Sequence, residues 1–377
     1  MEPIYLDNQA STPMHPRVVA AMADAGYGNP HASSHSIGWN AAAKVERARE
    51  SVAALIGADP DEIFFTSGAT EANNLAILGV RKLRSEDRDG VLRPTIEHKS
   101  VLAACDALAE EYGFQVGTIP VGADGRVDLA YFGEGPVDRV VLLSTAFVNN
   151  EIGTVQDIAA IGGLRGEALF HCDAAQAPEA VDMAGTAVHC DMMSLSSHKM
   201  RGPMGIGALY IARAVQKRIK PIMYGGGQQS GIRPGTLPLQ LCVGFGVACD
   251  IAREGAENRK TLARLRDAFL DTLHNQGLRF SLNGSSELGK RHPGNANIRL
   301  HGVDAEQLIA VLQPRVAAST GSACTSGSLE PSYVLTSLGL TREEASQSIR
   351  FSLGHETTLA EVHETALMIG EAIKRLA

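Results

Sequence analysis

The segment Thr66–Gly79 reads TSGATEANNLAILG and predicts a strand end, a glycine-containing turn and a helix in immediate succession. The apolar run IFFTS (63–67) leads into it, and the helical part begins with Thr70 and Glu71. Backbone N–H groups and hydroxyls at a helix N-terminus form a site suited to an anion such as phosphate. When the segment is taken alone, an ordinary capped helix explains it better than a phosphate site, so its meaning depends on the rest of the chain.

Outward from this segment, short apolar or β-branched runs alternate with helical patterns from about residue 40 to residue 215. Further candidate strands are VVLLSTAF (140–147), ALFHCDA (168–174), MMSLSS (192–197) and GALYIA (207–212). This alternation is typical of a parallel sheet covered by helices, in which ligands bind beyond the C-terminal ends of the strands. Four polar clusters fall at such ends: Thr66–Glu71, Asn149–Glu151, Asp173 with Gln176, and Ser196–Lys199.

The pattern changes after residue 215. A glycine-rich stretch, MYGGGQQSGIRPGT (223–236), predicts an irregular functional loop, and a long helical region follows from 237 to about 274. We then expect a second, smaller α/β unit with strands at ANIRLHG (296–302) and SIRFSLG (348–354) and a closing helix from about 358 to 376.

Composition limits the class of protein. The 377 residues are 44% hydrophobic, enough for two or three folding units of ~150 residues each, which excludes a disordered or fibrous chain. The net charge of −8, without long blocks of like charge, argues against a dedicated nucleic-acid-binding or membrane-surface protein. No apolar run approaches the ~18 residues of a spanning helix, and the start MEPIYLDNQ lacks a secretion-signal pattern, so a cytoplasmic protein is expected.

The six cysteines form no CxxC pair, so we expect reduced thiols and no metal site. Cys324 lies in STGSACTSGS, whose small and hydroxylated residues predict an exposed or mobile loop. The other five lie in apolar runs, where a buried and inert thiol is expected: Cys105, Cys172, Cys190, Cys242 and Cys249.

An aspartate and a lysine at strand ends point to a cofactor. Asp173 ends a predicted strand in HCDAAQ, and Lys199 follows the next one in SSHK. A buried carboxylate needs a cation, and a lysine on a turn of small residues can form an imine. Pyridoxal phosphate satisfies both, since the carboxylate pairs with its pyridine nitrogen and the lysine binds its aldehyde carbon. On spacing alone, a solvated surface lysine stays an alternative.

Ten segments, in chain order, resemble the successive motifs of the NifS/IscS-type cysteine desulfurases in the class V aminotransferase superfamily. They are YLDNQASTP, NPHASSH, TSGATEANN, EHKSV, VNNEIGTVQDI, CDAAQ, SSHKMRGPMGIGALYI, GGGQQSGIRPGT, GSACTSGSLEPSYVL and SIRFSLG. The similarity covers essentially the whole chain. It implies an α/β protein of the PLP-dependent transferase fold type I, with a mainly parallel seven-stranded sheet flanked by helices. The implied large cofactor-binding domain is 15–260, and 1–14 with 261–377 form the smaller α/β domain.

The resemblance also implies roles for individual residues. Lys199 would bind the cofactor aldehyde and take the substrate Cα proton, His98 would stack on the ring as an acid/base, and Cys324 would be the nucleophile. Arg350 would bind the substrate carboxylate through two nitrogens. Asp173 would pair with the pyridine nitrogen, and Gln176 and Asn150 would lie near the phenolic oxygen, with Asn150 also at the substrate. The residues at the phosphate would be Ala69, Thr70, Ser196 and His198. Thr236 would reach the phosphate bound by a neighbouring subunit, which implies a homodimer.

Structural alternatives stand beside these roles. His98 could only cap its helix, and Arg350 could only serve an internal salt bridge. His171, His189 and His301 have no matching role and are interpreted as structural. Two residues depart from the family pattern: Ser197 stands where glycine is usual, and His355 follows SIRFSLG where a basic or small residue is expected.

The implied activity converts L-cysteine to L-alanine and transfers the sulfur to Cys324 as a persulfide, then to an acceptor protein. Neutral free cysteine has a pKa of ~8.5, so a proton acceptor such as His98 is expected near Cys324. Alternatives are a selenocysteine lyase, an aminotransferase, and a partner-dependent scaffold for sulfur relay. No direct nucleic-acid or membrane partner is expected. The sulfur acceptor stays open among iron–sulfur clusters, thiolated tRNA and sulfur-modified DNA.

Overall fold

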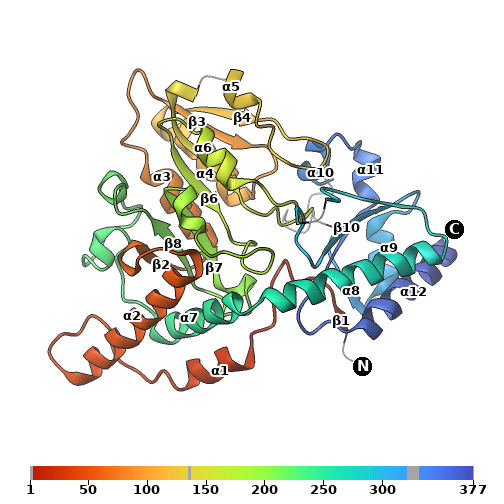
Figure 1. The fold of residues 1–377 in the computed structure, drawn as a ribbon, viewed down its shortest axis with the longest axis horizontal. Helices are drawn as coiled ribbons and strands as arrows, with labels where there is room; N and C mark the ends of the chain where they lie inside the picture. Colours follow the sequence, from red (N-terminus) through yellow and green to blue (C-terminus); the bar gives the residue numbers. More distant parts are fainter. Residues whose placement is uncertain (1–2, 135–136, 288, 321–330, 377) are drawn as a thin grey trace.

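A seven-stranded sheet forms the centre of the computed structural model, which describes residues 3–134, 137–287, 289–320 and 331–376 (Figure 1). The strand order is β2-β8-β7-β6-β5-β3-β4, and only β8 runs antiparallel to its neighbours in this sheet. The mainly parallel α/β fold is therefore confirmed. The strands are β2 (Ile63–Thr66), β3 (Gly90–Pro94), β4 (Gln115–Ile119), β5 (Val140–Ala146), β6 (Leu169–Asp173), β7 (Met192–Ser196) and β8 (Gly207–Ile211).

Helices cover both faces of this sheet. One apolar cluster joins the sheet to α2 (Ser36–Ile56) and α7 (Leu239–Arg253), and a second joins it to α3 (Ala69–Gly79) and α4 (Lys99–Tyr112). Successive residues of β2 alternate between the two clusters, as a pleated strand requires. Because both faces are covered, the central strands are continuous apolar runs. Beside these helices lie α1 (Pro16–Ala23), α5 (Tyr131–Glu134) and α6 (Ile158–Leu164).

A third apolar cluster contains Ile4, Leu6 and residues from Leu262 onward, and the division at residues 14 and 260 stays a prediction. Its three-stranded antiparallel sheet has the order β12-β10-β9, and β1 pairs in parallel with β11. The predicted helical region 237–274 is two helices, α7 and α8. The remaining elements are β1 (Ile4–Tyr5), α8 (Ala256–Asn275), β9 (Phe280–Leu282), β10 (Asn295–Leu300), α9 (Ala305–Leu312), β11 (Val316–Ala317), α10 (Tyr333–Ser337), α11 (Arg342–Ser346), β12 (Ser348–Ser352) and α12 (Leu359–Leu376).

The five cysteines in apolar runs are reduced and buried, as predicted. Burial raises the pKa of the Cys105 and Cys242 thiols to about 12, so these thiols stay protonated near neutral pH. Cys324 lies outside the described residues. Within the described part of the chain, no helix is sufficiently long and apolar to cross a membrane.

Candidate active site

The four polar clusters predicted from the sequence meet at one edge of the central sheet. β5, β6 and β7 are parallel, with Ala146 paired to Asp173 and Asp173 paired to Ser194. β2 runs in the same direction, because both β2 and β7 are antiparallel to β8. The C-terminal ends of these four strands therefore share an edge, which is the usual ligand-binding edge of such a sheet.

Asp173 is a buried carboxylate at this edge, with 6% of its surface exposed. Its Oδ2 accepts a hydrogen bond of 2.7 Å from Asn73 Nδ2, and its Oδ1 accepts one of 3.0 Å from the Ala175 backbone N–H. Donors of this kind compensate the loss of water around a buried carboxylate. Asn73 lies on α3 and belongs to the TSGATEANN motif, but the sequence did not identify it as a site residue.

His98 is joined to the same network. The Asn73 amide donates to the Ser100 hydroxyl at 2.9 Å, and the Ser100 hydroxyl lies 2.8 Å from His98 Nδ1. Nδ1 also accepts from the Ser100 N–H at 3.1 Å, so His98 does cap α4. Burial lowers the pKa of His98, against the opposing effect of Asp173. The neutral imidazole then carries its proton on Nε2, since Nδ1 is an acceptor.

Lys199 and Gln176 meet at the N-terminal segment. Lys199 Nζ donates to the carbonyls of Gln9 and Ala10, both at 2.7 Å. Gln176 Nε2 donates to the same Gln9 carbonyl at 2.8 Å. Lys199 is thus beside the sheet edge that carries Asp173, in the turn Ser197–Lys199 after β7. The backbone carbonyls that position these two side chains come from the YLDNQASTP motif, and side-chain patterns alone could not reveal them.

The N-terminus of α3 fits a phosphate group. Gly68 precedes the helix with φ of +150°, a conformation that favours glycine, and a Cβ at this position would meet open space. Among the described residues no side chain caps the helix there, so the N–H groups of its first turn, including those of Ala69 and Thr70, can serve an anion. On the neighbouring turn, burial and Lys199 lower the pKa of His198 to about 4, and its Nδ1 lies 3.3 Å from the Ser11 hydroxyl.

Arg350 lies on β12 and reaches the turn after β5. Its guanidinium pairs with Asp7 Oδ1 at 2.6 Å and donates to the Asn150 carbonyl at 2.7 Å. The internal salt bridge considered from the sequence is therefore present. Its Nε is buried and has no hydrogen-bond partner among the described residues, so the guanidinium retains donor capacity.

The glycine-rich loop is anchored against β2. The Gln229 side chain accepts from the Phe65 N–H at 2.7 Å and donates to the Phe65 carbonyl at 2.9 Å, as a neighbouring strand would. Arg233 pairs with both oxygens of Glu71 at 2.7 and 3.0 Å. Thr236 at the end of this loop is exposed. The contacts of Gln229 and Arg233 were not predicted.

The two departures from the family pattern have local explanations. A Cβ at Gly202 would lie 2.1 Å from the hydroxyl oxygen of Ser197, so glycine at 202 leaves room for this side chain. His355 pairs with Glu179, and both side chains are nearly buried.

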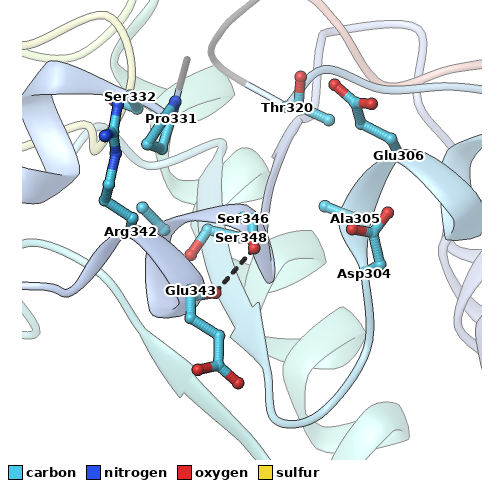
Figure 2. A pocket seen from close by; sticks show the side chains of 11 residues that line it. Asp304, Ala305, Glu306, Thr320, Pro331, Ser332, Arg342, Glu343, Ser346 and Ser348 are labelled. Carbon is cyan, nitrogen blue, oxygen red and sulfur yellow. Dashed lines mark hydrogen bonds between the residues drawn. The ribbon is translucent and has the colours of Figure 1, made fainter. Parts of the chain in front are cut away.

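A cavity of about 390 Å³ lies elsewhere, among residues of α9, α11, the start of β12 and the segments after β11 and before α10 (Figure 2). None of the sequence-predicted site residues lines it in the described part of the chain, so it is not the site formed at the strand ends.

Comparisons with known proteins agree with this geometry. The aminotransferase class-V family model matches residues 4–364, and the chain belongs to this family. Within it, the chain groups with the cysteine desulfurases of NifS/IscS type, as its motifs predicted. It is 44% identical to the cysteine desulfurase IscS of Rickettsia africae (strain ESF-5), over 99% of this chain and 92% of that protein.

Solved structures show the same fold. A NifS-like protein superposes with a TM-score of 0.90 at 31% identity, over 99% of this chain and 100% of the other. The structure described as SspA in complex with cysteine gives a TM-score of 0.80 at 34% identity, over 94% of this chain and 99% of the other.

Proposed function

We propose that this protein is a PLP-dependent cysteine desulfurase that converts L-cysteine to L-alanine and passes the sulfur through Cys324 to an acceptor protein. The observation that carries the proposal is the placement of Asp173 and Lys199 at adjacent strand ends beside an uncapped helix N-terminus. The 44% identity to a cysteine desulfurase over nearly the whole chain supports the choice of substrate.

The residues at the strand ends fit pyridoxal 5′-phosphate. Asp173 is ready to pair with a pyridinium nitrogen, because a buried carboxylate is best compensated by a cation. The first turn of α3 with Ala69 and Thr70, together with Ser196 and His198, would hold the phosphate, and Gln176 and Asn150 the phenolic-oxygen side. When bound, the group supplies an electrophilic aldehyde and a ring that accepts electrons.

The residues of this chain would then divide the work. Arg350 binds the substrate carboxylate and Asn150 helps to orient the substrate. Lys199 takes the Cα proton, and the neutral ring of His98 is suited to accept the Cys324 thiol proton. The Cys324 thiolate attacks the substrate sulfur, so that an S–S bond forms as the C–S bond breaks. The electron pair of the C–S bond stays with the substrate carbon, which takes up a proton, and the three-carbon product leaves as L-alanine.

We propose a homodimer in which Thr236 reaches the phosphate bound by the partner. Large apolar side chains are exposed in the isolated chain around this loop and around residues 27–39: Tyr27, Ile37, Trp39, Met223 and Tyr224. A cavity of about 470 Å³ lined by Pro30, His31, Gln229 and Leu237 joins the two regions. Exposed apolar area of this kind marks an interaction surface. Light scattering tests the mass, and a monomer in solution would contradict the shared site.

Product analysis after adding L-cysteine tests the function. L-alanine in amounts matching the sulfur released supports a desulfurase, a keto acid supports an aminotransferase, and no product supports a scaffold. L-selenocysteine, added in parallel, tests for lyase specificity. Transfer of labelled sulfur to candidate acceptor proteins from iron–sulfur, tRNA-thiolation and DNA-modification pathways then identifies the acceptor.

A further inference from the structure

Glu151 is a buried carboxyl group that the proposed mechanism does not use. It follows Asn150 in the turn after β5, and 3% of its surface is exposed. Its Oε1 is buried and has no hydrogen-bond partner among the described residues. Ser332, the N-cap of α10, hydrogen-bonds its carboxyl and also lines the cavity of Figure 2, so this group is one side chain away from open space. An ionised carboxylate with an unpaired oxygen is unfavourable in such a place.

The turn fixes where this carboxyl lies. Asn149 Oδ1 accepts from the backbone N–H groups of Glu151 and Ile152, at 2.9 and 3.0 Å. The Glu151 carbonyl accepts from the side chains of Asn295 and Asn297, at 3.0 and 3.2 Å. The position of the side chain is therefore set by the backbone, independently of its own charge.

Arg350, the cation whose charge acts on Glu151, already has an anionic partner. Arg350 pairs with Asp7 at 2.6 Å and uses a second nitrogen for the Asn150 carbonyl. A second cation, Arg291, donates to the Ile152 carbonyl on the other side of the turn. The oxygens that accept from Arg291 are neutral carbonyl and amide oxygens. With Glu151 ionised, the charge of one guanidinium would act on two carboxylates, those of Asp7 and Glu151. A substrate carboxylate would be the third, in a site shielded from water.

We propose that Glu151 is a positioning residue that must carry a proton for Arg350 to bind the substrate carboxylate. The inference rests on the proposed role of Arg350. The proton comes from solvent and goes to the Glu151 carboxyl, where Oε1 has no hydrogen-bond partner among the described residues, and no other bond changes. Binding of a carboxylate and protonation of Glu151 thus favour each other.

The pH range follows from the surroundings of Glu151. Burial raises its pKa to about 7, while the hydrogen bond from Ser332 and the charge of Arg350 act in the opposite direction. Since the pKa is raised, the neutral form predominates below this value and is lost as the pH rises through it. Affinity for the substrate carboxylate should therefore fall above neutral pH.

The test compares KM for L-cysteine in the wild type and in Glu151→Gln across the pH range. The amide keeps the shape of the neutral acid but cannot ionise, and the titration of the substrate cancels in the ratio of the two KM values. The ratio of wild-type KM to E151Q KM should rise about tenfold from about pH 6 to about pH 8, because only the neutral fraction binds. A ratio that stays constant with pH would overturn the proposal, even if E151Q changes KM, since a purely structural role gives a constant ratio.

A second measurement needs no variant. Propionate has a carboxylate but neither an amine nor a thiol, so its binding to the wild-type holoenzyme reports the carboxylate site alone. Calorimetry at about pH 8, in two buffers of different ionisation enthalpy, should show uptake of nearly one proton per propionate bound. Binding without proton uptake would overturn the proposal.

Failure of the proposed role of Arg350 gives a different result. If Arg350→Gln leaves KM for L-cysteine unchanged at about pH 6, the carboxylate does not bind there, and the roles proposed for Arg350 and Glu151 both fail. If R350Q raises KM but the ratio of wild-type KM to E151Q KM does not change with pH, only the proposed role of Glu151 is wrong.

Discussion

Asn73 donates one hydrogen bond to the Asp173 carboxylate at 2.7 Å and contacts the Ser100 hydroxyl at 2.9 Å with the same nitrogen. Ser100 in turn contacts His98 Nδ1 at 2.8 Å. A single chain of hydrogen bonds therefore joins the proposed partner of the pyridine nitrogen to the histidine proposed to stack on the ring. Two helix N-terminal regions, those of α3 and α4, are coupled through this chain.

The first prediction concerns Asn73→Ala. Loss of a hydrogen bond to a buried carboxylate costs about 1.5–3 kcal/mol, so kcat/KM for L-cysteine should fall about tenfold to a hundredfold. Steady-state kinetics measure this loss. The matched control is Asn74→Ala, because the Asn74 amide bonds only the Thr70 carbonyl among the described contacts. Equal losses in both variants would mean that the network is structural.

Lys199→Ala should abolish turnover. Removal of the group that takes the Cα proton typically lowers a rate by about 10²–10⁴-fold. The absorption band of the cofactor bound through Lys199 should also disappear. Lys217→Ala, which removes an exposed lysine of the same subunit, serves as the control. Substantial turnover in K199A would show that another group takes the proton.

Cys324→Ser should separate cofactor binding from sulfur transfer. Cys324 is not among the residues proposed to hold the cofactor, so the absorption band should persist, whereas alanine production from L-cysteine should be lost because a hydroxyl does not form a persulfide. Cys105→Ala controls for removal of a buried thiol. Full turnover in C324S would exclude the persulfide route.

The fourth prediction concerns stability and Glu97. Burial and the nearby Asp173 raise the pKa of Glu97 to about 8, although the Ala146 N–H donates to its Oε1 at 2.9 Å. In the unfolded chain the same carboxyl ionises near ~4.3, so its contribution to stability is full below that pH and is lost as the pH rises toward 8. Glu97→Gln removes this loss.

Thermal unfolding of the holoenzyme measures the effect. The melting temperature of E97Q minus that of the wild type should increase by a few degrees between about pH 5 and about pH 8. The same difference for Glu110→Gln, an exposed residue of α4, should not change with pH. A pH-independent difference for E97Q would show that Glu97 ionises normally in the folded protein.

Strand patterns predicted five strands of the central sheet, including β2, but not β3 and β4. β5, β6, β7 and β8 were predicted because both faces are buried, which makes each an apolar run. β3 and β4 were not located, since GVLRP contains glycine, arginine and proline, and the partly exposed edge strand QVGTI mixes polar and small residues.

Sequence patterns also predicted some residues of the candidate site and missed others. Asp173, Lys199 and His98 were predicted because they stand in motifs at strand ends or before a helix. Asn73, Gln9 and Glu151 were not found as site residues, although they lie in the same motifs. Their importance depends on a backbone carbonyl, a single hydrogen bond or a buried charge, and these appear only when segments distant in sequence pack together.

The most direct test follows sulfur and carbon together in the wild-type holoenzyme after one equivalent of L-cysteine. Mass spectrometry of the peptide that contains Cys324 should show the addition of one sulfur atom, removable by a thiol reductant, while an equal amount of L-alanine appears. Alanine without sulfur on Cys324, or sulfur on another cysteine, would contradict the proposed route.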